Sequence, residues 1–310
     1  MKRTLKDYFV VASKGIAMGA ADVIPGVSGG TIAFISGIYE EFIDALKSFN
    51  FSLIRKLKNE GLAETWKHIN GNFLLALFSG ILISIVSLAK LIGYLLLHHA
   101  EILWSFFFGL ILASTYFIGK KIGRWNVYPV FFLLVGIIIA YYITVAAPTE
   151  TPEYTWFIIL AGAIAICAMI LPGISGSFIL LLLGKYAFIL NAVSTLNIKV
   201  LISFAIGCVL GLISFSHVLS WMFRKYHDIT MALLTGFMIG SLNKVWPWKN
   251  TLLWGTDHHG KQIALKQTSV LPGYYENDPH LLYCILFAVL GLVVIILLEK
   301  QSNNNIPTQK

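Results

Sequence analysis

The chain has 310 residues, of which 57% are hydrophobic, 14% aromatic and 12% charged, and its formal net charge is +8 at pH 7. Soluble domains contain roughly 45–50% apolar and about 25% charged residues, so this composition, with a mean hydropathy of +0.77, excludes an ordinary soluble protein and predicts a polytopic membrane protein. The positive charge does not indicate a nucleic-acid partner, because Lys and Arg cluster in short segments between apolar runs and form no single basic stripe.

A Pro-Gly break interrupts an apolar run near the start of the chain. Residues 21–31 read Ala-Asp-Val-Ile-Pro-Gly-Val-Ser-Gly-Gly-Thr. Such a break inside a membrane is costly unless protein or water satisfies the freed backbone, so it predicts a functional site. The preceding residues, basic at the start and apolar over 8–21, also fit a cleaved signal peptide. We disfavour cleavage because it would leave the break as a ragged terminus, whereas the second copy of the motif has a complete apolar arm at 156–171.

Three long apolar runs follow the first break. Each is near the roughly 20 residues that a bilayer requires, and they cover residues 73–97, 103–118 and 127–147. A shorter apolar stretch at 31–45 and a basic segment at 47–67 precede them. We therefore expect three transmembrane helices here.

Charges in the connecting segments predict the side of the membrane on which each lies. The segment 48–70 is rich in Lys and Arg, and the turn 119–126 contains Lys120, Lys121 and Arg124. Both are predicted to be cytoplasmic, because basic residues are enriched in cytoplasmic loops. The loop 148–154 has two glutamates and no basic residue, and is predicted to be extracytoplasmic.

The second half of the chain repeats this order. The break returns at 168–177 as Ala-Met-Ile-Leu-Pro-Gly-Ile-Ser-Gly-Ser, with short apolar arms at 156–171 and 173–193. Further apolar runs cover 200–223, 230–245 and 281–298. The polar loop 247–280 is predicted to be extracytoplasmic.

Aligned glycines and polar residues support the match between the halves. Gly37 and Tyr39 meet Gly184 and Tyr186 at the offset of the two breaks. At a second constant offset four more pairs align: Gly80 with Gly207, Ser87 with Ser214, Gly109 with Gly236, and Ser114 with Ser241.

The repeat predicts an inverted architecture. Each half contains three spans plus a broken pair of arms, so it crosses an odd number of times whether the arms span or re-enter, and the copies must then be inverted. We expect an all-α polytopic membrane protein, a single membrane domain of two inverted-topology repeats at 1–150 and 151–310. Each repeat would have a broken or re-entrant helical hairpin plus three transmembrane helices, with the N- and C-termini cytoplasmic.

The two breaks form the candidate binding site. A helix that opens with Pro-Gly-x-Ser-Gly offers N–H groups, a positive helix end and a hydroxyl, which suit a phosphate or carboxylate. The candidate substrate-binding residues in the breaks are Ser28, Gly29, Gly30, Thr31, Ser175, Gly176 and Ser177. The alternative is that the glycines only allow close helix packing, which would require neither the prolines nor the paired serines.

Asp22 is the candidate for ion coupling. An intramembrane carboxylate can carry a proton or bind a cation. Its counterpart in the second copy is Met169, so any acid-dependent step should rest on the first copy. The alternative is that Asp22 caps the helix that begins at the break.

Three basic residues are candidate partners for a phosphate. Lys90 and His217 stand at equivalent positions of the two halves, and Lys185 lies inside the second Gly-x-Tyr element. Each has an alternative: Lys90 snorkels to the headgroups, His217 makes a polar packing contact, and Lys185 emerges in the outer headgroup layer. The three cysteines, Cys167, Cys208 and Cys284, show no metal-ligand spacing, so we predict neither a metal site nor a cofactor.

The doubled motif resembles that of the bacterial polyprenyl-phosphate transporter family, the PopT type. The resemblance covers essentially the whole chain. It implies a translocase, or flippase, and not an enzyme, which returns undecaprenyl phosphate from the outer to the cytoplasmic leaflet of the bacterial cell (inner) membrane for cell-envelope synthesis. Asp22 is expected to couple this transport to an H⁺ or Na⁺ gradient, and the sequence does not choose between the ions.

Two other functions stay open at this point. The Pro-Gly-x-Ser element also resembles that of membrane undecaprenyl-pyrophosphate phosphatases, in which an arginine follows the serine. Here Gly29 and Gly176 take that position, so nothing obvious stabilises the charge of phosphoryl transfer. A transporter for a small soluble anion would use the same helix ends, and is disfavoured only by the resemblance.

Overall fold

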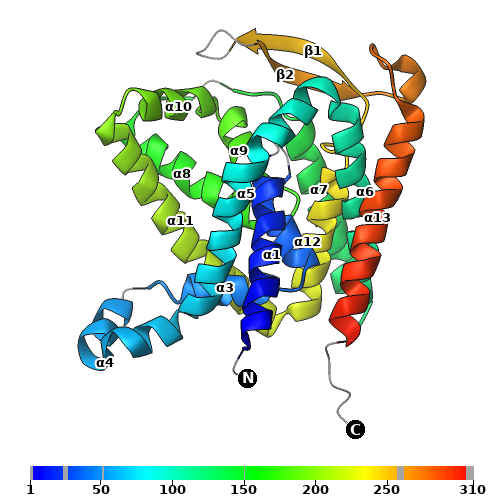
Figure 1. Cartoon of the computed structure of the whole chain (residues 1–310). Helices are drawn as coiled ribbons and strands as arrows, with labels where there is room; N and C mark the ends of the chain where they lie inside the picture. Colours follow the sequence, from blue (N-terminus) through cyan, green and yellow to red (C-terminus); the bar gives the residue numbers. More distant parts are fainter. Residues whose placement is uncertain (1–2, 24–26, 51, 150, 257–261, 305–310) are drawn as a thin grey trace. The chain divides into compact units, whose positions relative to one another are not determined.

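The computed structural model describes residues 3–23, 27–50, 52–149, 151–256 and 262–304. The described part is mostly helical and contains one β-hairpin (Figure 1). The helices of the first half are α1 (Leu5–Asp22), α2 (Gly29–Ile35), α3 (Tyr39–Lys47), α4 (Ser52–His68), α5 (Gly71–His98), α6 (Ala100–Lys120) and α7 (Val127–Val145). The second half contains α8 (Thr155–Ile170), α9 (Gly176–Leu182), α10 (Tyr186–Ser194), α11 (Ile198–Lys225), α12 (His227–Ser241), β1 (Lys249–Thr256), β2 (Gln262–Ser269), the 3₁₀ turn η1 (Pro272–Tyr274) and α13 (Leu281–Asn304).

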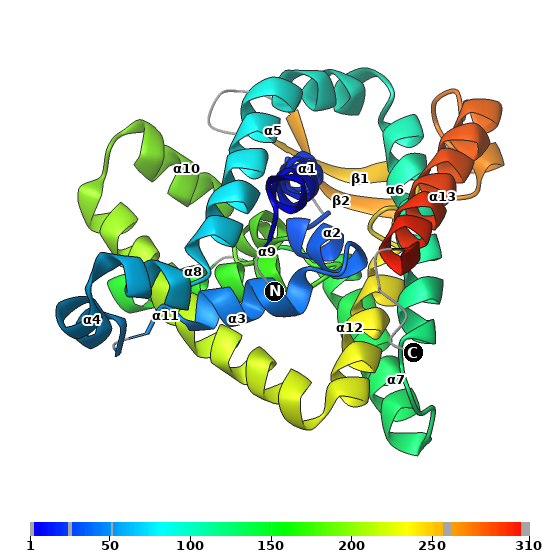
Figure 2. The ribbon, with the colours of Figure 1, turned by 60° about the horizontal axis from the view of Figure 1, so that its bottom comes forward.

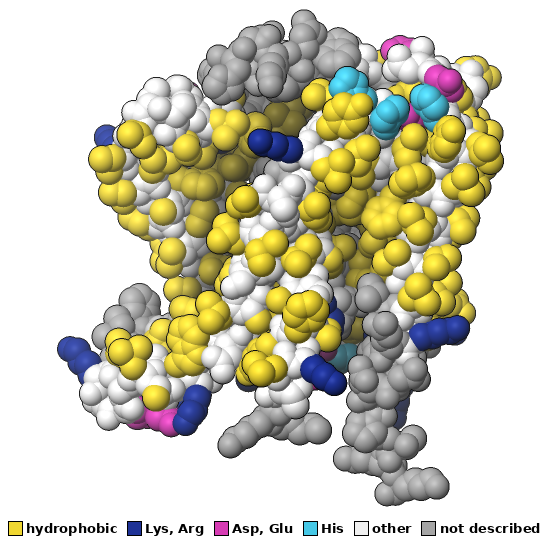
Figure 3. Space-filling view, viewed as in Figure 1, with side chains coloured by type: hydrophobic (Ala, Val, Ile, Leu, Met, Phe, Trp, Pro, Cys, Tyr) yellow, Lys and Arg dark blue, Asp and Glu magenta, His cyan; other side chains and the backbone are white. Residues whose placement is uncertain are grey.

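The predicted class, a helical polytopic membrane protein, is confirmed. Among the described residues, four helices are long and apolar enough to cross a membrane: α5 over Gly71–Leu88, α6, α7 and α11. The visible face of α13 is covered mostly by hydrophobic side chains, with a basic side chain near its C-terminal end (Figure 3). Helix α12 ends at Ser241, four residues before the end of the predicted span 230–245. Pro247 follows shortly after, as is typical where a helix cannot continue.

Each copy of the motif consists of three helices in place of the expected pair of arms. Helices of seven and nine residues follow the long arm in both copies, as α2 and α3 and again as α9 and α10. Gly37 (φ 72°) and Gly184 (φ 63°) separate them. This left-handed conformation strongly favours glycine, which explains why the aligned Gly-x-Tyr elements begin with it. Helices α9 and α10 bend by 108° at that point.

The chain forms two compact units that do not follow its halves. Unit 1 consists of residues 1–92, 151–180 and 192–227, and unit 2 of residues 93–150, 181–191 and 228–310. Each unit thus takes segments from both halves of the sequence.

In unit 1, glycines bring two pairs of helices close together. A Cβ atom added to Gly80 of α5 would lie 2.9 Å from the backbone nitrogen of Ile16 on α1. Its aligned counterpart Gly207, on α11, would collide with the backbone of Ile159 on α8 in the same way. Helices α8 and α11 therefore pack as α1 and α5 do, through small residues that let two backbones approach.

In unit 2, helices pair across the two halves. Helix α6 lies beside α13 (Figure 1 and Figure 2), with Gly109 of α6 against the backbone of Ala288. The counterpart of Gly109 is Gly236 on α12, which packs against Leu133 and Gly136 of α7. Equivalent glycines therefore make equivalent contacts, each with the last helix of the other half.

The β-hairpin of unit 2 was not expected from the sequence. Strands β1 and β2 are antiparallel, with Lys249 opposite Ser269 at their open end. Asn243 anchors this end, because its side-chain amide donates to Thr144 Oγ1 of α7 (2.9 Å) and its Oδ1 accepts from Ser269 (2.9 Å). The strands occupy part of the loop predicted to be extracytoplasmic, of which residues 257–261 lie outside the described part.

Candidate functional site

The two Pro-Gly breaks meet in unit 1. Three side chains of the first copy bond to the backbone of the second. Ser28 Oγ donates to the carbonyl of Met169 (2.8 Å), and the Tyr39 hydroxyl donates to the carbonyl of Ile170 (3.2 Å). Thr31 Oγ1 accepts from the N–H of Gly173 (2.8 Å).

These bonds satisfy the backbone groups that the second break sets free. Met169 and Ile170 are the last residues of α8, and the last four carbonyls of a helix have no partner within it. A buried unpaired carbonyl in hydrocarbon costs several kcal/mol. The side chains of Ser28, Thr31 and Tyr39 are almost fully buried, so this part of the first copy has a structural role.

Within the first break, the amides that begin α2 bond to acceptors of the same break. Asp22 Oδ1 accepts from the N–H of Gly29 (2.7 Å), and Ser28 Oγ accepts from the N–H of Gly30 (3.1 Å). The N–H of Thr31 donates to the Ser28 carbonyl (2.9 Å). The first three amides of α2 therefore already have acceptors. Ser28 is the N-cap residue, and the Asp22 carboxylate caps the amide of Gly29, which is the alternative role considered for Asp22 above. The Ile-Pro-Gly element of this copy, residues 24–26, lies outside the described residues.

The second break is more open. Ser175 Oγ lies 2.8 Å from Ser177 Oγ; Ser175 is buried, whereas Ser177 is exposed. Within the described residues, the N–H groups of Gly176 and Ser177 make no hydrogen bond to a side chain. The difference follows from the sequence, because Met169 replaces the capping Asp22 and Ser177 replaces Gly30.

The three basic candidates are divided between the two units, with Lys90 and His217 in unit 1. Lys90 is exposed on α5, and His217 Nδ1 lies 2.7 Å from the carbonyl of Ile213 on its own helix. Lys185 belongs to unit 2, where its ammonium lies 5.4 Å from the ring centroid of Phe188. No hydrogen bond among the described residues joins Lys90 or His217 to a break.

Sequence reasoning missed a polar link between α3 and α11. Ser220 Oγ donates to Asp44 Oδ1 (2.6 Å), and Lys47 Nζ donates to Ser220 Oγ (3.3 Å). Ser220 is buried. In the sequence, the only indication of this link was a serine near the end of an apolar run. Tyr39 was noted only as part of an aligned element, and its bond across the breaks could not be foreseen. In the described part of the chain, no three His, Cys, Asp or Glu side chains are grouped to hold a metal ion.

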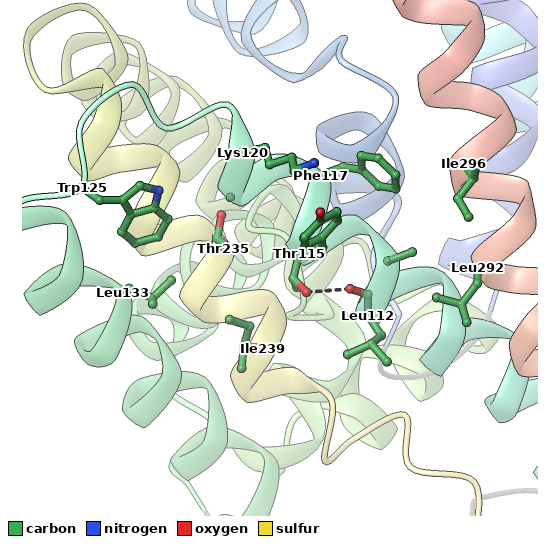
Figure 4. Close-up of a pocket in the computed structure, with 13 residues that line it drawn as sticks. Leu112, Thr115, Phe117, Lys120, Trp125, Leu133, Thr235, Ile239, Leu292 and Ile296 are labelled. Atoms are coloured by element: carbon green, nitrogen blue, oxygen red, sulfur yellow. Dashed lines mark hydrogen bonds between the residues drawn. The ribbon is translucent and has the colours of Figure 1, made fainter.

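Unit 2 contains an apolar groove of about 680 Å³ between α6, α7, α12 and α13 (Figure 4). Thr115, Tyr116 and Lys120 of α6 and Thr235 of α12 supply its polar atoms. Most of its lining is hydrocarbon, with Leu112, Leu133, Ile239, Leu292 and Ile296 among the lining residues. Its dimensions and lining suit an aliphatic chain.

These features define a multi-pass helical membrane protein with paired helix breaks, an arrangement typical of transporters. The family model described as VCA0040-like, undecaprenyl phosphate translocase-like, matches residues 18–263, and the chain belongs to this family. The family resemblance noted from the doubled motif is thereby confirmed.

Two relatives agree with this assignment. A polyprenyl-phosphate transporter of Vibrio cholerae serotype O1 is 49% identical over 300 residues, which is 96% of this chain and 97% of the relative. A polyprenyl-phosphate transporter of Staphylococcus aureus is 33% identical over 261 residues, or 78% of this chain and 88% of the relative. No solved structure matches the chain. The family and both relatives are transporters, and the chain is a transporter rather than an enzyme, as predicted.

Proposed function

We propose that the chain moves undecaprenyl phosphate across the bacterial cell membrane, from the outer to the cytoplasmic leaflet, and so returns this lipid for cell-envelope synthesis. The family and the names of the two relatives support a polyprenyl phosphate as the substrate. The observation that carries the proposal is the joined pair of breaks in unit 1. One break holds the other in place, and the second keeps a hydroxyl pair for a ligand.

The phosphate binds, in this proposal, at Ser175, Gly176 and Ser177. A phosphate oxygen accepts well from hydroxyl and amide donors, and hydrogen bonds to charged groups are the stronger ones. The first break then has a structural role and holds the second in place, because its donors and acceptors are already engaged. This group consists of Ser28, Gly29, Gly30 and Thr31. Lys90, His217 and Lys185 remain proposed charge partners along the path, where a cation lowers the cost of an anion in the membrane.

The apolar groove of unit 2 favours a lipid over a small soluble anion. A small anion needs polar lining, whereas a groove with mostly hydrocarbon walls accommodates part of an isoprenoid chain. The phosphate alone would then move through polar surroundings, while the long chain stays in hydrocarbon.

The two halves are proposed to be inverted repeats. The exchange of partners in unit 2, α6 with α13 and α7 with α12, is the contact pattern that a two-fold relation between the halves would produce. With basic segments inside, both termini are proposed to be cytoplasmic.

Transport assays with undecaprenyl phosphate in proteoliposomes test the proposal. Ser177→Ala should bind the lipid about tenfold to a hundredfold more weakly, because one bond to a charged group contributes roughly 1.5–3 kcal/mol. Ser194→Ala on α10, a serine outside the breaks, serves as the matched control. Wild-type protein that leaves the leaflet distribution of the lipid unchanged would contradict the function, and unchanged affinity in Ser177→Ala would move the phosphate site elsewhere.

A second arm of the experiment separates transport from hydrolysis. We expect no phosphate release from undecaprenyl pyrophosphate, because the breaks offer hydroxyls and amides without an arginine. Phosphate release at enzyme-like rates would contradict this part.

A further inference from the structure

Helix α4 projects from the rest of unit 1, and most of its described side chains are exposed (Figure 1 and Figure 2). Gly61, in the left-handed conformation (φ 79°), divides it into two short segments. Among its described side chains only Thr65 is buried, and the Thr65 hydroxyl donates to the carbonyl of Gly61 (2.8 Å). Short helices without packing partners are marginally stable in water, so α4 needs a surface to lie on.

Both segments of α4 are amphipathic. In the second segment, Leu62 and Trp66 are one turn apart and are 77% and 40% exposed. The ion pair of Glu64 and Lys67 (2.6 Å) takes the other side of this segment. In the first segment, Leu57 is 45% exposed. Figure 3 shows hydrophobic side chains along the upper side of α4 and charged ones along its left and lower edges. This division is typical of a helix that lies between hydrocarbon and water.

Trp66 fixes the level of α4 relative to a membrane span. Its indole Nε1 donates to Asn72 Oδ1 (2.8 Å), and a Cβ atom added to Gly71 would collide with its ring. Gly71 and Asn72 begin α5, which is long and apolar enough to cross a membrane from Gly71 onward. Tryptophan favours the membrane–water interface. Helix α4 therefore ends at the level where α5 enters the bilayer, and the bilayer surface is next to it.

The polar side of α4 carries positive charge that its own acids do not neutralise. The basic residues of the helix outnumber the acidic ones: Arg55, Lys56, Lys58 and Lys67 against Glu60 and Glu64. Lys56 pairs with Glu60 (3.6 Å), and Lys67 with Glu64. In the described part of the chain, the exposed Arg55 and Lys58 form no ion pair. A basic amphipathic helix beside a span is attracted to anionic lipid headgroups.

We propose that α4 is an interfacial helix that binds the anionic headgroups of phospholipids through Arg55 and Lys58. Leu57, Leu62 and Trp66 then enter the boundary of the hydrocarbon, which removes their exposed apolar surface from water. These phospholipids belong to the surrounding membrane and are not the transported lipid. The proposal therefore does not rest on the proposed function.

Contacts at the end of α4 extend to the first copy of the motif. The side-chain amide of Asn70 donates to Glu41 Oε1 (2.6 Å), and Arg3 pairs with the same carboxylate. Glu41 lies on α3, the second short helix after the first break. Binding of α4 to the lipid surface therefore also holds α3 near that surface.

Fluorescence of the full-length protein in nanodiscs tests the proposal. In a background without the native cysteines, Leu62→Cys carries an environment-sensitive dye, which lipids with brominated acyl chains quench only on contact. In an equal mixture of the two lipids, brominated phosphatidylglycerol should quench this dye more strongly than brominated phosphatidylcholine. Glu64→Cys, on the polar side of the same segment, is the matched control, and its dye should be quenched by aqueous iodide instead.

Charge variants measure the headgroup preference. Arg55→Gln and Lys58→Gln should each lower the preference for phosphatidylglycerol about fivefold, because each basic residue near an anionic surface contributes an attraction of that size. Lys199→Gln, which changes an exposed lysine at the start of α11, is the control. Equal quenching by the two lipids in wild type, or quenching of the Leu62→Cys dye by iodide, would overturn the proposal. A dye shielded from iodide and from both lipids would show that a second copy of the chain covers this side of α4, and would overturn it as well.

Discussion

The two serines that open the short helices, Ser28 and Ser175, differ in what they contact. Ser28 is 1% exposed and joins the breaks through the Met169 carbonyl, whereas the hydroxyl of Ser175 forms a hydrogen bond with that of Ser177. Identical residues in a repeated motif therefore differ in role, because the residues around them differ. In the first copy, Asp22 accepts a hydrogen bond from the start of the short helix, and Gly30 stands at its second position. In the second copy, Met169 and Ser177 occupy the equivalent positions, and Met169 offers no such acceptor.

Replacing Ser28 should affect folding more than binding. Ser28→Ala leaves the Met169 carbonyl and the Gly30 amide without their partner, and a buried unsatisfied group costs about 1–3 kcal/mol. We expect a lower free energy of unfolding in detergent, measured by a denaturant titration. Ser177→Ala, at the exposed hydroxyl, should leave that free energy within about 0.5 kcal/mol of wild type; a larger fall there than in Ser28→Ala would contradict the division of roles.

Replacing Asp22 separates its capping role from ion coupling. Asp22→Asn keeps an oxygen that can accept from Gly29, so the protein should fold normally, but an amide cannot exchange a proton. If Asp22 couples transport to a gradient, this variant should transport equally well with and without an H⁺ or Na⁺ gradient, whereas wild type should be faster with one. Asp22→Ala should in addition lose about 0.5–2 kcal/mol of stability, as other lost caps do. Gradient-dependent transport by Asp22→Asn would exclude Asp22 as the coupling group.

At the scale of elements, close packing depends on a few glycines at equivalent positions. Gly80 and Gly207 each stand where a neighbouring backbone occupies the space of a side chain. Membrane helices have little hydrophobic drive to associate, so contacts of this kind supply much of the attraction. Helices α1 and α8 lead into the two breaks. Their packing against α5 and α11 therefore fixes where each break begins.

Gly80→Ala should therefore destabilise the protein. The added methyl group would meet the backbone of Ala12 and Ile16, and overpacking typically costs about 1–3 kcal/mol. The matched control is Gly93→Ala on the same helix, where no atom lies within 4 Å and alanine should be neutral or stabilise by about 0.5–1 kcal/mol. Unfolding midpoints of the two variants provide the comparison, and equal midpoints would show that this helix contact is not tight.

At the scale of the whole molecule, the charges of the connecting segments predict a topology. In a background without the native cysteines, single cysteines at Lys58 and Arg124 should react only with reagent on the cytoplasmic side. Single cysteines at Thr149 and Gln267 should react with impermeant reagent from outside. Labelling of Thr149 and Gln267 from opposite sides would contradict the proposed inversion of the halves.

The sequence predicted the elements that depend on local composition and missed those that depend on geometry. Apolar runs revealed α5, α6, α7 and α11, because a span is defined by length and hydropathy alone. The bond from Asp22 to Gly29 required the chain to fold back across the break, which no spacing rule describes. The hairpin at β1 and β2 was hidden in a polar loop, where short alternating segments give a weaker signal than long apolar runs.

The interleaving of the two units has a consequence for synthesis. Unit 1 cannot be complete until residue 227 has been made, although its first segment ends at residue 92. At about 5–20 residues per second, the ribosome needs roughly 7–27 s to make the intervening chain. Until residues 170–173 have been made, Thr31 and Tyr39 have no second break to bond with. We therefore expect the polar groups of the N-terminal arm to stay hydrated at the membrane surface, or bound to an insertion factor, until then. A chain truncated before α8 should accordingly be degraded by membrane proteases.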